Sequence, residues 1–412
     1  MTSSSISGPV RRLLLLVGAM VFVDTIFFTA LTPLLPQYAE ELDLSKAGVG
    51  VLAAAYPAGA LVGGIPGGLS AARFGVKPTV IAGLLLMVVT TTIFGFANGI
   101  VLLDLARFVQ GFASALTWTA ALAWLVSRAP AGRRGLLIGT AMSAAIVGAL
   151  CGPILGAVAS LTGTEIAFTA VGAAGLGLAV WAALTPAARP EEPQPLSMLW
   201  QAVKDRAILG TVWFVALPAL LFSTMGVLVS LRLDDLGMSA VGIGIAFLVS
   251  AAVEAVLNPL AGRISDVRGR LLPIRVGLAA SAVMTAVLPW PDSRWVLVAF
   301  VILAGMSFGV FWTPAMSHLT DLAEGRGLDY AYGFALVNLA WAPGQALGAS
   351  GGGALARGTS DAVPYLVLAG VCLLSLLLVG RAPARTSPRP EPPPPGIFAP
   401  ETRTGGNGNK RR

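Results

Sequence analysis

The chain has 412 residues, of which 56% are hydrophobic and only 11% are charged. Its mean hydropathy of +0.80 lies far above that of water-soluble domains, which excludes a soluble globular fold. The formal charge is +7, but the basic residues are spread among loops rather than gathered on one face, which argues against a nucleic-acid partner. Because the apolar runs are long and continuous, a membrane barrel is excluded and an all-α membrane protein is expected.

The first apolar run, residues 13–36, carries an aspartate near its middle. A helix of about 24 residues spans roughly 36 Å, so Asp24 is expected near the midplane of a bilayer. A carboxylate there costs about 2.5–3.5 kcal/mol on insertion scales, unless it meets water, a partner or a proton pathway. We therefore interpret Asp24 as functional; the alternative is a core aspartate satisfied by neighbouring hydroxyl groups.

Eleven further apolar runs follow, so the sequence predicts twelve membrane-spanning helices. Runs of this length cross a bilayer as helices, because a helix satisfies its backbone polar groups internally. We place the spans at residues 13–36, 47–70, 78–97, 100–127, 135–161, 166–184, 207–233, 241–264, 272–290, 296–319, 330–355 and 363–380.

Two polar segments divide this pattern. Residues 186–206 combine proline, charge and a short amphipathic patch, and we interpret them as a cytoplasmic linker. Residues 382–412 are too rich in proline, glycine and charge to pack, so we expect a disordered cytoplasmic tail. The expected organisation is an N-terminal six-helix bundle at residues 1–185 and a C-terminal six-helix bundle at residues 207–381.

Basic side chains gather in the loops on one side of the predicted membrane, and acidic ones in the loops on the other. Arg11, Arg133 and Arg268 lie on the basic side, while Glu40 and Asp234 lie on the acidic side. Because loops rich in lysine and arginine stay in the cytoplasm, both termini are expected inside. We expect a monomeric, multi-pass protein of a bacterial plasma (inner) membrane.

The two predicted bundles are related in sequence. A shift of 194 residues aligns Ser45, Gly48, Gly50 and Gly75 with Ser239, Gly242, Gly244 and Gly269. A shift of 196 residues aligns Gly148, Gly152 and Gly156 with Gly344, Gly348 and Gly352. A parallel repeat of six spans is typical of a transporter built from two halves around a site at mid-membrane.

Three predicted spans carry polar stripes at helical spacing, which lipid cannot solvate. We expect these stripes to face the bundle interior or a water-filled cavity; the alternative is hydrogen bonding between helices. For Arg107, the structural alternative is an ion pair with Asp104, one turn away. The stripes are Arg107, Gln110, Ser114 and Trp118 on the fourth span, Ser250, Glu254 and Asn258 on the eighth, and Asn338, Trp341 and Gln345 on the eleventh.

Several motifs resemble those of the major facilitator superfamily. The fourth span reads LDLARFVQGFASA, similar to the family's R-x-x-Q-G motif, and the first span resembles that of the vesicular amine transporters and their bacterial relatives. The fifth span reads GALCGPILGA, similar to the G-x-x-x-G-P-x-x-G-G motif of drug/proton antiporters, with Gly148, Gly152, Pro153 and Gly156 matching and Ala157 replacing the last glycine. The resemblance implies the major facilitator fold of two pseudo-symmetric six-helix bundles.

The chain also departs from the family pattern. After the second span the family reads G-x-x-x-D-R-x-G-R-K, whereas this chain reads GLSAARFGVK, with Ala72 in place of the aspartate but Arg73 and Gly75 kept. Charge contacts in the first half are therefore expected to be weaker than those in the second. The second-half copy, GRISDVRGR, keeps Asp266, Arg268, Gly269 and Arg270.

Together, these features predict proton-coupled efflux of an amphipathic small molecule such as a drug, antibiotic or secondary metabolite. We expect Asp24 to carry the proton and Arg107 to favour the ionised form of this carboxylate. Glu254 is expected to be a second proton carrier or a counter-ion for a cationic substrate. The glycines of the fifth span are expected to pack closely on the eighth span, where the halves rock. The expected substrate cavity comprises Phe28, Gln110, Ser114, Trp118, Trp312, Asn338, Trp341 and Gln345, with Trp213 and Phe311 as further aromatic candidates.

Other functions stay open. A proton symporter or facilitator that imports a nutrient would share the fold, and so would a membrane sensor that transports nothing. An enzyme is not expected, because no nucleophile is paired with a base. The one histidine, His318, has no second histidine or cysteine near it, so neither a metal nor a cofactor is expected; the expected partners are a small-molecule substrate, protons and lipid.

Overall fold

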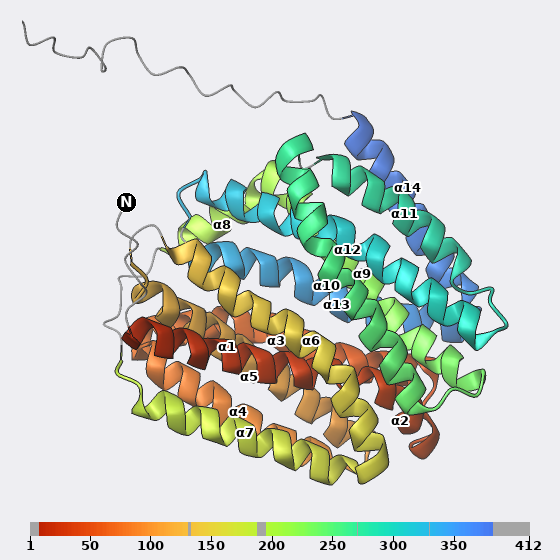
Figure 1. The fold of residues 1–412 in the computed structure, drawn as a ribbon, viewed down its shortest axis with the longest axis horizontal. Coiled ribbons are helices and arrows are strands. Elements are labelled where there is room, and N and C mark those ends of the chain that lie inside the picture. The colour runs from red at the N-terminus through yellow and green to blue at the C-terminus, as the bar shows by residue number, and fades with distance from the viewer. Residues whose placement is uncertain (1–7, 131–132, 188–194, 270, 329, 382–412) are drawn as a thin grey trace, which may run out of the picture.

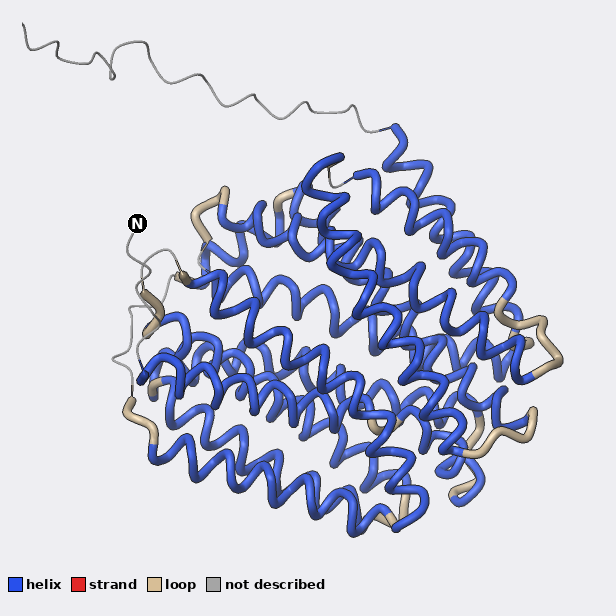
Figure 2. The backbone as a smooth tube through the Cα atoms, in the orientation of Figure 1, coloured by secondary structure: helices blue, strands red, loops and turns tan. Residues whose placement is uncertain are grey.

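The structure is a computed structural model, and it describes residues 8–130, 133–187, 195–269, 271–328 and 330–381. Within these residues the regular secondary structure is helical throughout (Figures 1 and 2). The elements are α1 (Gly8–Thr29), η1 (Thr32–Leu34), α2 (Leu35–Glu41), α3 (Lys46–Phe74), α4 (Val76–Phe96), α5 (Ile100–Ser127), α6 (Arg134–Thr162), α7 (Thr164–Leu184), α8 (Leu196–Lys204), α9 (Arg206–Asp235), α10 (Ala240–Arg268), α11 (Leu271–Val287), α12 (Arg294–Glu324), α13 (Tyr330–Gly358) and α14 (Ala362–Arg381).

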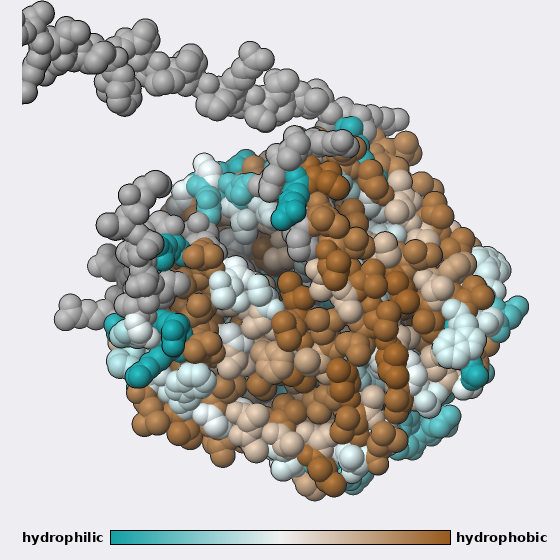
Figure 3. All heavy atoms as spheres, in the orientation of Figure 1, coloured by the Kyte–Doolittle hydropathy of each residue, from teal (hydrophilic) through white to brown (hydrophobic). Residues whose placement is uncertain are grey.

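Ten of the described helical segments are long and apolar enough to cross a membrane. The two remaining predicted spans coincide with α11, which is apolar but has only 17 residues, and with α13, in which Asn338, Gln345 and several glycines lower the hydropathy. Figure 3 shows apolar side chains across the middle of the visible face and hydrophilic ones toward its edges. The prediction of an all-α membrane protein is confirmed.

The first predicted span is not one continuous helix. The run at residues 13–36 ends its α-helix at Thr29, and the chain continues through η1 into α2. Pro33 and Pro36 each stand at the first or second position of the element that follows. Proline has no backbone N–H to donate and clashes with the preceding turn, so the first turn of an element is where it disturbs the helix least.

Successive spans run in alternate directions, so every long helix has one end near α8 and the other near α2 (Figure 1). We call these the α8 end and the α2 end. α1 begins at the α8 end, whereas α3 begins at the α2 end. The loops with most basic residues lie at the α8 end, and the acidic loop residues Glu40 and Asp234 lie at the α2 end.

The repeat between the halves extends to the helix caps. Ser45 caps the start of α3 by accepting a hydrogen bond from Gly48 N, and Ser239 caps α10 in the same way through Gly242 N, both at 3.3 Å. At the other ends, Gly75 and Gly269 have φ of 95° and 84°, a region that favours glycine because it lacks Cβ. Residues that share a position in the repeat therefore share a structural role.

The glycines of the fifth-span motif face α1 rather than the eighth span. A methyl group added at Gly148 would lie 2.7 Å from the Phe22 carbonyl oxygen, and one at Gly152 would lie 2.7 Å from that of Ile26. The predicted close approach of the fifth and eighth spans is found at Pro153, whose carbonyl oxygen lies 2.7 Å from a methyl group added at Gly244 of α10, whereas Gly148 and Gly152 face α1. They fix α1 within its own half, because only glycine lets two helix backbones approach this closely.

This placement predicts that Gly152→Leu weakens the packing of α1 in the N-terminal half. The new side chain would overlap Thr29 Oγ1 and the Ile26 carbonyl, and overpacking of this kind costs about 1–3 kcal/mol or more. The measurement is thermal melting of the purified protein in detergent. Gly139→Leu, on the same helix but with no atom within 4 Å of the added Cβ, is the matched control. Equal melting temperatures for both variants and the wild type would contradict the packing assignment.

The halves meet at the α2 end. Across this interface a methyl group at Gly244 of α10 would lie 2.7 Å from the carbonyl oxygen of Pro153 on α6. Its counterpart in the repeat is Gly50 of α3, which packs directly against the carbonyl oxygen of Ala349 on α13. An ion pair between Lys46 and Asp361, with N and O atoms 2.6 Å apart, joins the same halves at this end.

The segment between the halves forms α8, which leads directly into α9. Asp205 caps α9 by accepting hydrogen bonds from Ala207 N (2.7 Å) and Ile208 N (3.3 Å), and it pairs with Arg326 at 2.6 Å. These bonds, with that from Ala207 the largest, hold the pKa of Asp205 below its usual value. The rest of the predicted linker, residues 188–194, and the predicted tail, residues 382–412, lie outside the described residues.

Candidate functional site

Asp24 lies in the middle of α1 with only 4% of its surface exposed. Its carboxylate accepts hydrogen bonds from three neutral side chains of the same half. The hydroxyl of Tyr56 on α3 lies 2.9 and 3.0 Å from the two carboxylate oxygens. Ser114 Oγ and Trp118 Nε1, both on α5, donate to Oδ2 at 2.9 and 2.7 Å. The structure thus brings together three predicted site residues, Asp24, Ser114 and Trp118.

These donors suit a carboxylate that alternates between two protonation states. An ionised carboxylate only accepts hydrogen bonds, and three donors compensate part of the cost of its removal from water. Burial in a medium of low dielectric works the other way and favours the neutral acid. When Asp24 takes up a proton it becomes a donor as well, and the hydroxyls of Ser114 and Tyr56 can then accept. The site can therefore hold either state without an unpaired polar atom.

Close packing of α3 on α5 places Tyr56 beside Asp24. A methyl group at Gly63 of α3 would lie 2.7 Å from the Phe112 carbonyl oxygen. From the other side, Gly111 of the R-x-x-Q-G motif packs directly against the carbonyl oxygen of Tyr56. A side chain at Gly111 would push α3 away, and the Tyr56 hydroxyl would leave hydrogen-bonding distance of the carboxylate.

Arg107 lies in an aromatic cage rather than in an ion pair. It is 1% exposed, and its guanidinium carbon lies 5.2, 4.9 and 5.8 Å from the ring centroids of Phe27, Tyr56 and Phe94. Cation–π attraction of this kind strengthens when the groups are out of water. Nη2 also donates to the Phe28 carbonyl at 3.4 Å.

Asp104 precedes Arg107 by one helical turn and Asp24 lies across from it on α1, but neither acid forms a salt bridge with Arg107. Within the described residues, no ion pair joins Arg107 to Asp24 or to Asp104. The alternative of an Asp104–Arg107 pair is therefore not realised in this conformation, and Asp104 Oδ1 is buried without a hydrogen bond. The side chain of Tyr56 lies next to both groups, with its ring under the Arg107 guanidinium and its hydroxyl on the Asp24 carboxylate.

Gln110, which the sequence placed in the substrate cavity, lies inside the N-terminal half. Its side chain is fully buried and donates through Nε2 to the carbonyl of Thr90 on α4 at 3.1 Å. The polar stripe of α5 is thus split: Ser114 and Trp118 reach Asp24, and Gln110 binds α4. Gln110 and Trp118 are eight residues apart, so their side chains leave the helix in directions about 80° apart.

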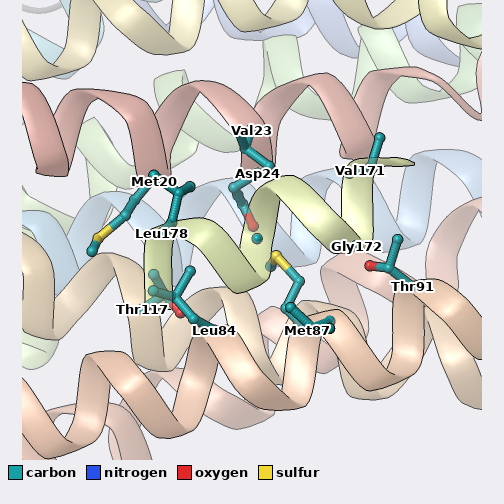
Figure 4. A pocket seen from close by; sticks show the side chains of 12 residues that line it. Met20, Val23, Asp24, Leu84, Met87, Thr91, Thr117, Val171, Gly172 and Leu178 are labelled. Carbon is teal, nitrogen blue, oxygen red and sulfur yellow. The ribbon is translucent and has the colours of Figure 1, made fainter. Parts of the chain in front are cut away.

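A small cavity of about 10 Å³ adjoins Asp24 between α1, α4, α5 and α7. Figure 4 shows the side chains of Asp24 and Met87 pointing toward one another across it. A space of this size holds at most about one water molecule, so it is no substrate chamber. Its lining is Met20, Val23, Asp24, Leu84, Met87, Val88, Thr91, Thr117, Val171, Gly172, Gly175 and Leu178.

An aromatic contact joins the two halves close to this site. The ring of Phe28 on α1 lies 5.0 Å from that of Tyr56 and 5.4 Å from that of Trp341 on α13, measured between centroids. The second pair is T-shaped, with an interplanar angle of 68°. Phe28 and Trp341 were both predicted to line the substrate cavity, and the structure places them in contact with each other.

The other predicted aromatic and amide residues lie in the C-terminal half. Trp312 packs partly buried against the core around Leu319, and Phe311 is fully buried against Gly277 of α11. Trp213 donates to Ser375 of α14 at 2.9 Å, which holds it within its own half. The side chains of Asn338 and Gln345 are half-buried on α13. Only Trp341 of this group reaches the N-terminal half through an aromatic ring contact in the described structure.

Glu254 is half-buried on α10 where this helix packs on α12. A methyl group at Gly309 of α12 would lie 2.8 Å from Glu254 Oε1, so a glycine leaves room for the carboxylate. One turn earlier, Ser250 is buried and donates to the Val301 carbonyl on α12 at 3.2 Å. Ser250 therefore follows the alternative of bonding between helices, and the side chain of Asn258 lies outside the described residues.

The predicted conformational motif is only partly described. Arg73 is exposed, and its guanidinium lies 5.5 Å from the ring of the adjacent Phe74. The second-half residues Asp266 and Arg268 lie on α10, but their side chains, like all of Arg270, fall outside the described residues. Among the residues that are described, no group of three histidine, cysteine or acidic side chains could hold a metal ion.

The repeat shows that the acid site belongs to one half only. Gly148 faces Phe22 and Gly344 faces Ala216, so α1 and α9 correspond with a shift of 194 residues. By this shift Asp24 corresponds to Pro218 and Arg107 to Val301, neither of which can ionise. The halves thus share a scaffold, but only the N-terminal half has an aspartate and an arginine at these two positions.

The chain was compared with known proteins. The Major Facilitator Superfamily profile matches residues 17–328 and again residues 212–405. The human synaptic vesicular amine transporter is 26% identical over 303 residues, which cover 70% of this chain and 58% of that protein. Multidrug resistance protein 1 of Bacillus subtilis (strain 168) is 23% identical over 310 residues, covering 74% of this chain and 80% of that protein.

A solved structure shows a similar fold. The crystal structure of a bacterial homologue of the human lysosomal transporter Spinster, inward-facing and unoccupied, superimposes with a TM-score of 0.72 at 16% identity, covering 91% of this chain and 96% of that one. The chain spans less than two thirds of the human amine transporter's length. With the family profile matched over most of its length, the chain belongs to the major facilitator superfamily.

Proposed function

We propose that the chain is a proton-coupled exporter that exchanges protons for an amphipathic small molecule. The observation that carries this proposal is the buried carboxylate of Asp24, held by donors from Tyr56, Ser114 and Trp118 in the middle of a membrane-spanning helix. A site that accommodates both protonation states in the hydrocarbon region is what a proton carrier requires.

The loop charges support an orientation with the α8 end in the cytoplasm. Both chain termini then lie inside, in the plasma membrane of a bacterium, and the described conformation is closed toward the outside, because the halves meet at the α2 end. The proposed organisation is two six-helix halves joined by a cytoplasmic linker, working as a monomer. Export is favoured over import by the glycine-proline motif of α6 and by the similarity to a protein named for multidrug resistance.

In the proposed cycle, Asp24 releases its proton to the cytoplasm while the halves are closed at the α2 end. The charge of Arg107 near the carboxylate favours this release, and the three donors stabilise the resulting anion. Substrate then enters between the halves, which rock until the α2 end opens. There the substrate leaves and Asp24 takes a proton from outside, so that one proton and one substrate molecule have moved in opposite directions.

The substrate is proposed to lie between the halves beside Phe28 and Trp341. This pair offers a broad aromatic surface that can bind flat or amphipathic molecules without requiring hydrogen bonds of fixed direction. Trp312, Asn338 and Gln345 complete the proposed C-terminal side. Fluorescent-substrate transport into inverted membrane vesicles, with and without a protonophore, tests the function: transport that survives the protonophore would favour a facilitator, and none at all would favour a sensor.

We predict that Glu254→Gln removes transport of a lipophilic cation while sparing a neutral aromatic compound. The acid site around Asp24 is complete within the N-terminal half, which leaves Glu254 as a charge receptor in the other half. A receptor charge matters only to charged ligands, whereas a proton carrier serves every coupled cycle. Efflux of both compounds from the same vesicles is measured, with the exposed Glu324→Gln on α12 as control. Equal slowing of both compounds would show that Glu254 carries protons. No effect on either compound would show that Glu254 only packs against Gly309.

A further inference from the structure

Among the described residues, Tyr56 is the side chain that both donates a hydrogen bond to the carboxylate and makes a ring contact with the aromatic pair between the halves. Its hydroxyl lies within 3.0 Å of both oxygens of Asp24, and its ring lies 5.0 Å from Phe28. Phe28 in turn meets Trp341 of the other half. The sequence did not indicate this residue, and the family motifs do not include it.

We propose that Tyr56 couples the protonation of Asp24 to the contact between the halves. The proposal deepens the proposed function and rests on it, since it assigns the residue through which the proton site moves the interface. Tyr56 is a positioning residue in this scheme, because it acts on Trp341 only through Phe28. The continuous path is the Asp24 carboxylate, the Tyr56 hydroxyl and ring, the Phe28 ring and the Trp341 ring.

The physical basis is a change in one hydrogen bond. While Asp24 is ionised, its bond from the Tyr56 hydroxyl is charge-assisted, and such bonds are about twice as strong as neutral ones. Protonation removes the charge, so the hydroxyl is held less tightly and the ring is free to shift. Tyr56 is 2% exposed, and in a close-packed interior its ring cannot move without moving Phe28.

The surroundings leave few other groups that could transmit the charge change. The titratable or charged side chains that face Asp24 are Tyr56 of α3 and Arg107 of α5, whose guanidinium lies over the same tyrosine ring. From α4 and α7, the residues beside the carboxylate across the small cavity are uncharged, and α6 presents the glycines of its motif to α1. Both charges that act on the site therefore converge on the Tyr56 ring.

The test follows the fluorescence of Trp341 in the purified full-length protein between about pH 5 and 8, where folded proteins are commonly most stable. Subtracting the emission of Trp341→Phe from that of the wild type isolates this indole. The same subtraction is made in the Tyr56→Phe background, which keeps the ring and removes the hydroxyl. We expect a pH-dependent Trp341 signal in the wild type that Tyr56→Phe loses, because this variant lacks the hydrogen bond that links the ring to the carboxylate.

Two further variants test whether the signal depends on the ring contacts and whether it is specific to Tyr56. Phe28→Leu keeps the hydrogen bond to Asp24 but interrupts the ring contacts, so it should lose the signal as well. Tyr365→Phe, a buried tyrosine of α14 far from the site in the sequence, is the matched control and should keep it. A signal that titrates unchanged in Tyr56→Phe, that is absent from the wild type, or that Tyr365→Phe also abolishes would overturn the proposal.

The Asp24→Asn variant separates this inference from the proposed function. Loss of the Trp341 signal in Asp24→Asn, together with its persistence in Tyr56→Phe, would leave Asp24 as the proton carrier and refute only the role of Tyr56. Persistence of the signal in Asp24→Asn would instead remove Asp24 as the titrating group, and the proposed function would fail with it.

Discussion

Asp24→Asn is expected to abolish transport driven by a pH gradient while the protein still folds and inserts. Asparagine has the shape of aspartic acid but cannot exchange a proton, and its amide can still accept the hydrogen bonds of Ser114 and Trp118. Removing a buried charge also removes its desolvation cost, so the melting temperature should equal or exceed that of the wild type. Uptake of a fluorescent cation into proteoliposomes with an imposed pH gradient measures the effect.

The control for this variant makes the same substitution at an exposed aspartate outside the site. Asp292→Asn alters an aspartate whose side chain is 96% exposed in the loop before α12, and it should transport like the wild type. Exchange of labelled for unlabelled substrate at equal pH needs no net proton movement and should continue in Asp24→Asn. Gradient-driven uptake by purified Asp24→Asn at the wild-type rate would refute the assignment of the proton site.

Gly50→Leu is expected to stop transport by preventing closure at the α2 end. The Cβ of any larger residue would overlap the Ala349 carbonyl of the other half, which the backbone cannot easily relieve. Overpacking of about 1–3 kcal/mol shifts a two-state equilibrium by roughly five- to 150-fold toward the form in which the halves are apart at this end. The readout is cross-linking with a short bifunctional thiol reagent between cysteines introduced at Lys46 and Asp361, in a background without Cys151 and Cys372.

The matched control is Gly64→Leu, because an added Cβ there meets nothing within 4 Å on the same helix. Gly64→Leu should transport and cross-link like the wild type, whereas Gly50→Leu should do neither. Wild-type cross-linking in Gly50→Leu, or wild-type transport despite lost cross-linking, would show that the Gly50–Ala349 contact does not limit the cycle.

The spans and the repeat could be predicted from the sequence because both depend on local pattern. A helix in lipid needs a long and mostly apolar run, and the boundaries of the α5 prediction, residues 100–127, coincide with Ile100–Ser127. Ser45 and Ser239 could be aligned because each stands at the same position, three residues before the glycine whose N–H it accepts at the start of a helix. Asp24 could be singled out because a carboxylate at mid-membrane is energetically costly, and a costly residue of this kind is expected to have a function.

The partners of these residues could not be predicted, because they depend on how helices face one another. The spacing of Gly148 and Gly152 shows a close approach but does not say whether α1 or α10 provides the other backbone. Gln110 shares a stripe with Ser114, yet a small difference in angle turns it to α4. Tyr56 escaped notice because a tyrosine in an apolar run is ordinary until an aspartate is found 2.9 Å from its hydroxyl.

The restriction of the acid site to one half has a consequence for the cycle. Pro218 and Val301 stand where Asp24 and Arg107 stand in the repeat, so the C-terminal half has no acid at the equivalent depth of α9. In the proposed cycle, protonation of Asp24 acts on the N-terminal half, and the other half must respond through the interface. The contact of Phe28 with Trp341 is the aromatic link that the structure offers for this purpose.

The central claim is that substrate binding between the halves is coupled to release of a proton from Asp24, and proton release on substrate binding tests it most directly. The purified protein is kept in lightly buffered detergent with a pH indicator, and a transported lipophilic cation is added. We predict that the wild type releases protons in proportion to the substrate bound and that Asp24→Asn, binding the same substrate, releases none. Equal release from both proteins, or substrate binding to the wild type without any release, would contradict the account.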